Sequence, residues 1–290
     1  MRRLEFLIEE VIDSSDARNN KPYTNYELMR HFNSAQRTLQ KMANSAVRSG
    51  ELYIQSQQYD SIVDTGMPLP SDIHMQEGIV SVISNNSSGR RGRPYNRITP
   101  AEMGFKVGYF TLNGKLFISS VNKSNGFTLI YKKALPLMSL RIGEISSIDI
   151  SSSKVNFDPT TVPDPNHGYT SRYDYCSIVD FDGNIKSSNL RIKSQSGNSL
   201  TLIGDMTEST TGDYVVAGRV ATTHSELPNA CEEYLLSYVE RRLKNKIASD
   251  RSEMESLFTQ KERRDIKELF EDMDMSVRQP VIMDYDYRDL

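Results

Sequence analysis

The sequence is poor in the residues that build disulfide scaffolds, metal sites and membrane spans. It contains two cysteines, Cys176 and Cys231, four histidines and no tryptophan. Two cysteines are too few for a disulfide framework, and with the scattered histidines they form no spacing typical of structural zinc. No run approaches the roughly 18 apolar residues of a membrane-spanning helix, and the first residues lack the apolar segment of a signal peptide. We therefore expect neither a secreted cystine scaffold nor a membrane partner.

The motifs of common enzyme classes are also missing. The chain contains no G-x-S-x-G, no Walker A sequence and no G-x-G-x-x-G. Asp180 and Asp182 lie two residues apart, which is compatible with the carboxylate pair of a carbohydrate-active enzyme. An acidic turn at the Asp182-Gly183 dipeptide explains them more simply. The sequence thus predicts no enzyme, with no catalytic residue, no cofactor and no metal site.

The sequence is instead that of a polar globular chain with an uneven charge distribution. Of its 290 residues, 37% are hydrophobic and 25% are charged, which indicates a packed core rather than disorder. The formal net charge is −3, yet residues 80–138 carry nine basic residues and one acidic residue. Four arginines lie in that region: Arg90, Arg91, Arg93 and Arg97. On a loop they are candidates for contact with DNA phosphates or with an acidic partner, and a solvated loop is the alternative.

Helices are predicted at both ends of the chain. Apolar residues recur at helical spacing over residues 2–13, and a capping box predicts a second helix over Thr24–Ala46. Near the C-terminus, Pro228 opens one helix, and a further capping box predicts another over Ser252–Met273. The outer faces of residues 240–272 are dense in charged residues, which is typical of a solvated face.

Short β-like runs alternate with turn signals between these helices. The dipeptides Asn113-Gly114 and Asp182-Gly183 are typical of two-residue hairpin turns. We predict an α+β fold: a helical bundle formed by the N- and C-terminal helix pairs, with a long β-rich middle of hairpins and an inserted β domain. The predicted segments are N-terminal bundle helices 1–50, a β region 51–138, an inserted β domain 139–224, C-terminal bundle helices 225–275 and an extended tail 276–290.

Several short motifs follow one another in a characteristic order. A Thr-capped helix with the pattern E-L…N-x-A-Q comes first, then a Leu-Pro-x-Asp element, a hairpin and strand that end in Leu-Pro, and a Leu-Pro helix entry. Their positions are Thr24, Glu27, Leu28, Asn33, Ala35, Gln36, Leu69-Pro70-Ser71-Asp72, Tyr109–Ile118, Phe127–Tyr131, Leu135-Pro136 and Leu227-Pro228. Over roughly 1–138 and 225–290, this order resembles the head-to-tail connector proteins of tailed phages. These form the adaptor ring beneath the portal, and in short-tailed phages they are known as the adaptor or tubular tail protein.

The resemblance implies a structural virion protein of the neck or tail, assembled in the host cytoplasm. Such a protein would form a ring, commonly of twelve copies, and would join the portal protein to tail or nozzle proteins. The charged outer faces of residues 240–272 would then supply contacts between the subunits of the ring. Packaged double-stranded DNA would pass through the ring during ejection and would be contacted without sequence preference. Residues 139–224 depart from the compact family pattern and look like an extra β domain.

The resemblance also implies that the C-terminal segment reaches the portal. The candidate portal-docking residues are apolar or aromatic: Val281, Ile282, Met283, Tyr285, Tyr287 and Leu290. A partner groove or an added β-strand would account for this apolar character. A frayed terminus is the alternative.

Residues 24–53 allow a second interpretation. A short helix, a turn and a recognition helix followed by a β wing would make this chain a winged-helix DNA-binding regulator. The apolar seam from Leu28 to Ala46 keeps its period without a breaking residue. One continuous helix is therefore the simpler prediction.

Overall fold

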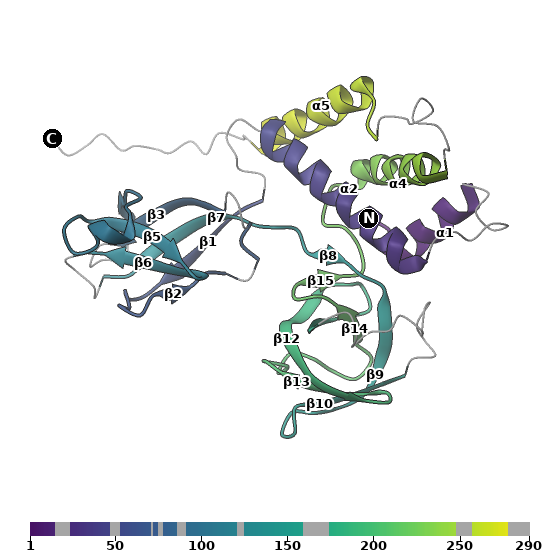
Figure 1. Cartoon of the computed structure of the whole chain (residues 1–290), viewed down its shortest axis with the longest axis horizontal. Coiled ribbons are helices and arrows are strands. Elements are labelled where there is room, and N and C mark those ends of the chain that lie inside the picture. Colours follow the sequence, from purple (N-terminus) through teal and green to yellow (C-terminus); the bar gives the residue numbers. More distant parts are fainter. Residues whose placement is uncertain are drawn as a thin grey trace.

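The fold is α+β, as the sequence predicts, and consists of three bodies (Figure 1). A helical bundle contains elements from both ends of the chain, a sheet module follows α2, and a closed six-stranded barrel follows the sheet module. The structure is a computed structural model that describes residues 1–14, 24–46, 53–70, 72–74, 78–85, 91–120, 125–158, 174–247 and 257–277.

In the described part of the chain, four helices share one hydrophobic core and form the helical bundle. They are α1 (Leu4–Ser14), α2 (Asn25–Ala46), α4 (Glu232–Ile247) and α5 (Gln260–Val277), with the short 3₁₀ helix η3 (Asn229–Cys231) leading into α4. Each helix contributes a side chain with no exposed surface: Leu7, Phe32, Leu235 and Phe270. Each helix alone would leave its apolar face in water, so the two ends of the chain are stabilised by covering each other.

Helix α2 is continuous, as predicted. The side-chain oxygen of Thr24 accepts a hydrogen bond from the Glu27 N–H at 3.2 Å, which caps the first turn. The helix then continues without a break to Ala46. The winged-helix alternative needs a turn between two helices, and no such turn lies within residues 25–46.

The predicted start of the last helix is wrong. Helix α5 begins at Gln260 rather than near Ser252, and Phe258 precedes the helix with only 3% of its surface exposed. Thr259 and Glu262 form the capping box: the Glu262 N–H donates to the Thr259 hydroxyl at 3.2 Å, and the Thr259 N–H donates to the Glu262 carboxylate at 2.8 Å. The sequence therefore contains two capping motifs of the same form, Ser252 with Glu255 and Thr259 with Glu262. Ser252 itself lies outside the described residues.

The sheet module contains two small antiparallel sheets. Its strands are β1 (Ile54–Tyr59), β2 (Met67–Pro68), β3 (Ile79–Asn85), β4 (Arg91–Pro94), β5 (Gly108–Leu112), β6 (Lys115–Ser119) and β7 (Phe127–Lys132), with the 3₁₀ helix η1 (Pro100–Glu102) between β4 and β5. One sheet has the order β1-β7-β3-β4 and the other β2-β6-β5. The predicted hairpin turn at Asn113-Gly114 is confirmed, because both residues have positive φ, +51° and +73°.

The barrel is formed by β9 to β14, all joined by antiparallel pairs. The strands are β9 (Arg141–Asp149), β10 (Lys154–Asp158), β11 (Tyr175–Val179), β12 (Ile185–Ser196), β13 (Ser199–Ile203) and β14 (Tyr214–Ala217). They close in the order β10-β13-β12-β11-β14-β9, so the described strands leave no open edge. The predicted turn at Asp182-Gly183 lies between β11 and β12, where the Gly183 N–H donates to the carbonyl of Asp180 at 3.0 Å.

The two ends of the barrel segment pair with each other, and the entering end contacts α2. Strands β8 (Leu137–Met138) and β15 (Ala221–Thr222) pair in parallel just before and just after the barrel. Asn33 on α2 donates to the carbonyl of Met138 at 2.7 Å and accepts from its N–H at 2.8 Å. Gln36 and Gln40 donate to carbonyls of residues 133–138 at 2.7 and 2.9 Å. Three amides on one helix face therefore hold the strand that enters the barrel.

Candidate interaction surfaces

The predicted arginine loop is in part a strand. Arg91 and Arg93 belong to β4, which pairs with β3, and the Ser84 hydroxyl donates to the carbonyl of Arg93 at 3.0 Å. The side chain of Arg93 is exposed. Arg90 lies outside the described residues. The prediction of a loop over these arginines is therefore wrong for residues 91–94, because they complete the edge of a sheet.

Arg97 lies apart from Arg93 and lines a different surface. Its backbone forms a bridge with Tyr109 of β5, and its side chain borders a cleft of about 530 Å³. Arg219, between β14 and β15, and His74, after β2, border the same cleft, whereas Arg93 does not. Sequence reasoning missed Arg219 and His74, because neither lies near the arginine-rich segment in the chain.

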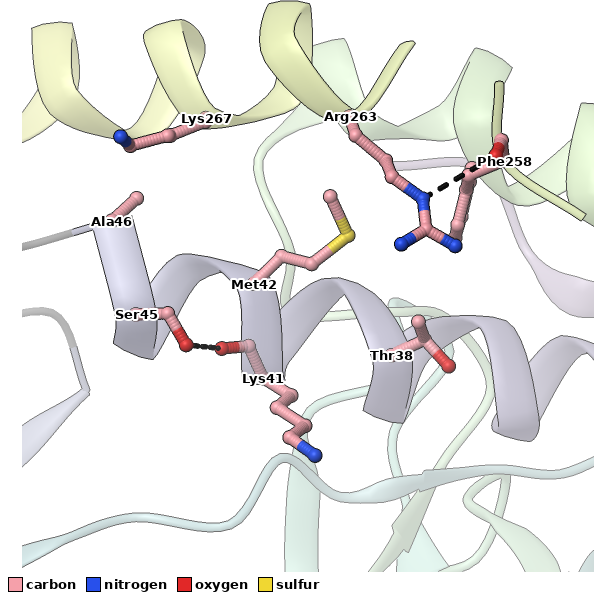
Figure 2. A pocket seen from close by; sticks show the side chains of 8 residues that line it. All are labelled: Thr38, Lys41, Met42, Ser45, Ala46, Phe258, Arg263 and Lys267. Carbon is pink, nitrogen blue, oxygen red and sulfur yellow. Dashed lines mark hydrogen bonds between the residues drawn. The ribbon is translucent and has the colours of Figure 1, made fainter. Parts of the chain in front are cut away.

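A groove of about 350 Å³ lies between α2 and α5 (Figure 2). Met42 projects from α2 toward α5, and the aliphatic part of Arg263 extends from α5 toward α2. The Nε of Arg263 donates to the carbonyl of Phe258 at 3.3 Å. Lys267 lies further along α5, whereas the amine of Lys41 points away from α5. The groove therefore combines an apolar floor with two cations on one wall.

The two candidate catalytic carboxylates have different surroundings. Asp180 accepts hydrogen bonds from the N–H and the side-chain amide of Asn184 at 2.8 and 2.9 Å. Burial raises the pKa of Asp180, but these hydrogen bonds outweigh it, so the pKa lies below its usual range. Asp182 is exposed and borders a cavity with Arg2 and His224 that Asp180 does not border. Asp180 therefore stabilises the hairpin turn, which matches the acidic-turn interpretation of the sequence.

The two cysteines are buried in different cores. Cys176 lies in the barrel and Cys231 in the helical bundle. Burial raises the pKa of each thiol to about 12, so both are protonated at neutral pH and are poor nucleophiles. Among the described residues, no three His, Cys, Asp or Glu side chains come together as they would around a metal ion. Within the same part of the chain, no helix has both the length and the apolar character needed to cross a membrane.

The remaining predicted interaction sites lie at the C-terminal end. The six candidate portal-docking residues between Val281 and Leu290 lie outside the described residues. On the exposed face of α5, Arg264 pairs with Glu268 at 3.5 Å and Lys267 with Glu271 at 3.6 Å. These pairs lie within one helix, so a role for this face between subunits stays a prediction.

Comparisons with known proteins supply no family for this chain. No protein-family model matches it. No curated protein matches it either. The resemblance to phage connector proteins therefore rests on the order of the sequence motifs.

Proposed function

We propose that this chain is a structural virion protein, the head-to-tail adaptor that joins a portal ring to tail or nozzle proteins around the DNA exit channel. One observation carries the proposal. The helices at both ends of the chain share a single core, from which the sheet module and the barrel extend as separate bodies. This arrangement suits a ring subunit, in which a rigid helical body repeats around an axis and the β bodies reach neighbouring components.

Two of the surfaces suit the proposed partners. The groove between α2 and α5 has an apolar floor beside Arg263 and Lys267, which suits a partner segment that alternates apolar and acidic residues. The exposed arginine Arg93 on β4 suits contact with DNA phosphates without sequence preference. Neither surface needs a catalytic group, and the proposed function has no chemical step.

The oligomeric state of the purified chain tests the proposal. Mass photometry is expected to find a species near twelve times the 33.0 kDa chain mass with the protein alone, or portal rings from the same virion that gain about that mass when the protein is added. Negative-stain images of that species would show a ring with a central hole. A chain that stays monomeric with and without portal rings contradicts the proposal.

The C-terminal segment gives a second test. Deletion of residues 279–290 is expected to leave a folded protein that no longer binds portal rings in a pull-down. Far-UV circular dichroism checks the fold, because every described residue of the bundle core precedes residue 279. Unchanged binding would remove residues 281–290 from the proposed interface.

A further inference from the structure

The cleft that Arg97 borders lies where the sheet module faces the barrel. The sheet module contributes Arg97, His74 and the hairpin turn between β5 and β6. The barrel contributes Arg219, from the short connection between β14 and β15. Its volume, about 530 Å³, lies in the range of small-ligand sites.

The charge in this cleft has one sign. Two guanidinium groups border it, and no carboxylate is among the described residues that line it. Neither Arg97 nor Arg219 forms an ion pair with another described residue. Two arginines at one cleft, neither of them paired with a described carboxylate, favour an anionic ligand.

Arg219 is held in place before any ligand arrives. Its guanidinium carbon lies 4.2 Å from the centre of the Tyr175 ring, so the flat face of the group is covered by the aromatic ring. Its backbone carbonyl accepts hydrogen bonds from the Asn189 N–H at 2.5 Å and from the Ser177 hydroxyl at 3.3 Å. Stacking covers the face of a guanidinium but leaves its N–H edge free to donate to a phosphate.

The rest of the lining combines an unpartnered ring nitrogen with an apolar wall. The Nδ1 atom of His74 is buried and has no hydrogen-bond partner among the described residues, and an unpaired buried polar atom is costly unless a ligand or water completes it. Leu69, Ile73 and Ile79 form the apolar wall, with Tyr109 beside them. A ligand that fits carries an anionic group and a flat, largely apolar ring with polar edges.

We propose that this cleft binds a nucleotide unit of a nucleic acid, with the phosphate between Arg97 and Arg219 and the base against the apolar wall. The inference rests on the proposed function for the presence of a nucleic acid and goes beyond its contact with duplex phosphates, because a base that lies against the wall is unpaired and therefore belongs to a single strand. An acidic peptide would satisfy the arginines, but its carboxylates bring no ring for the apolar wall and no polar ring edge for His74.

Fluorescence anisotropy with a short labelled oligothymidylate tests the proposal, and calorimetry with thymidine 5′-monophosphate separates a free nucleotide from a strand. The double substitution Arg97→Gln/Arg219→Gln is expected to weaken strand binding about tenfold or more. The plot of log affinity against log salt is expected to become shallower by about 0.7, because one phosphate contact is lost. The matched control is Arg191→Gln, an exposed arginine on β12 that does not line the cleft, and it should bind as the unaltered chain does.

The outcomes distinguish the nucleotide-binding cleft from the proposed ring assembly. Binding of the monophosphate that is lost in the double variant supports the cleft and assigns it to free nucleotides as well. Three results overturn it: no binding of either ligand by the unaltered chain, equal binding by the double variant, or tighter binding of an acidic Glu/Tyr peptide that the double variant loses. Mass photometry on the double variant should find the same oligomer, so a failed ring and a failed cleft give different results.

Discussion

The helical bundle and the barrel differ in which parts of the chain form their cores. The bundle core joins residues from Leu4 to Phe270, near the two ends of the chain. The described residues of the barrel core all lie between Ile142 and Ala217, within one continuous segment of the chain. The barrel can therefore form from one continuous segment. The bundle instead requires the two ends of the chain, which the β-rich middle separates in sequence, to come together.

A few contacts connect these two bodies. Glu5 on α1 accepts two hydrogen bonds from the guanidinium of Arg141 on β9, at 2.6 and 3.2 Å, and both side chains are largely buried. Asn33 and Gln36 hold the strand that enters the barrel. We therefore expect a substitution in the barrel core to destabilise the barrel alone. A substitution in the bundle core should separate the two chain ends and break the contacts that join the bundle to the barrel.

The largest expected effect comes from Phe32→Ala. Phe32 is fully buried at the centre of the bundle, and removing such a side chain costs about 3–5 kcal/mol of unfolding free energy. Hydrogen–deuterium exchange should show lost protection in α1, α2, α4 and α5 together. The matched barrel variant is Leu190→Ala, also fully buried, for which lost protection should be confined to β9–β14. An equal loss of exchange protection in the bundle and the barrel, for either variant, would contradict the independence of the two cores.

The next effect concerns the link between the bodies. Glu5→Gln leaves the buried guanidinium of Arg141 without its counter-charge, which we expect to cost about 3 kcal/mol. Urea unfolding measures this cost, and exchange should rise in α1 and β9. Glu10→Gln is the control, because Glu10 pairs with Arg2 on the surface, with 43% of its side chain exposed, and its effect should stay below about 1 kcal/mol.

A smaller and pH-dependent effect is expected at α5. A hydrogen bond from Arg241 and further ones from Thr259 lower the pKa of Glu262 to about 2. Because the pKa of Glu262 is lower in the folded state, the ionised carboxylate stabilises the fold at pH values above its ordinary pKa of 4.5. That stabilisation is lost as the pH falls toward 2. Glu262→Gln should therefore cost about 1–2 kcal/mol at pH 7, and the difference from the unaltered chain should shrink in thermal unfolding near pH 3.

The control for this prediction lies on the same helix. Glu268 forms an exposed pair with Arg264, so Glu268→Gln should change the unfolding free energy by less than about 0.5 kcal/mol. A difference between Glu262→Gln and the unaltered chain that stays constant from pH 7 to pH 3 would contradict the role given to the ionised Glu262.

The smallest effect on stability is expected for the basic segment. Replacing Arg90, Arg91, Arg93 and Arg97 by alanine should leave thermal unfolding nearly unchanged, because the described side chains of Arg93 and Arg97 are exposed. The variant should retain less DNA than the unaltered chain, and the difference between the two should be largest at low salt. Unchanged retention and unchanged docking to portal rings at low salt would discard the proposed contact.

Local patterns carried the correct predictions about the fold. The continuous helix up to Ala46 follows from an unbroken apolar seam, and the hairpin at Asn113-Gly114 follows from residues that tolerate positive φ. Sequence alone does not give the start of α5, because the capping motifs at Ser252 and Thr259 are equivalent in sequence. Only the packing of Phe258 and the contact of Glu262 with Arg241 distinguish the second motif.

By itself, the sequence determined which segments are helices, where two hairpins turn, and that the chain ends must cover each other. These features depend on neighbours a few residues apart, so periodicity and turn chemistry suffice. Only the tertiary structure decided that β9–β14 close into a barrel, that Asn33 and Gln36 hold its entry strand, and that Arg97, Arg219 and His74 border one cleft. Those results depend on contacts between residues distant in the chain, and such contacts leave no local pattern in the sequence.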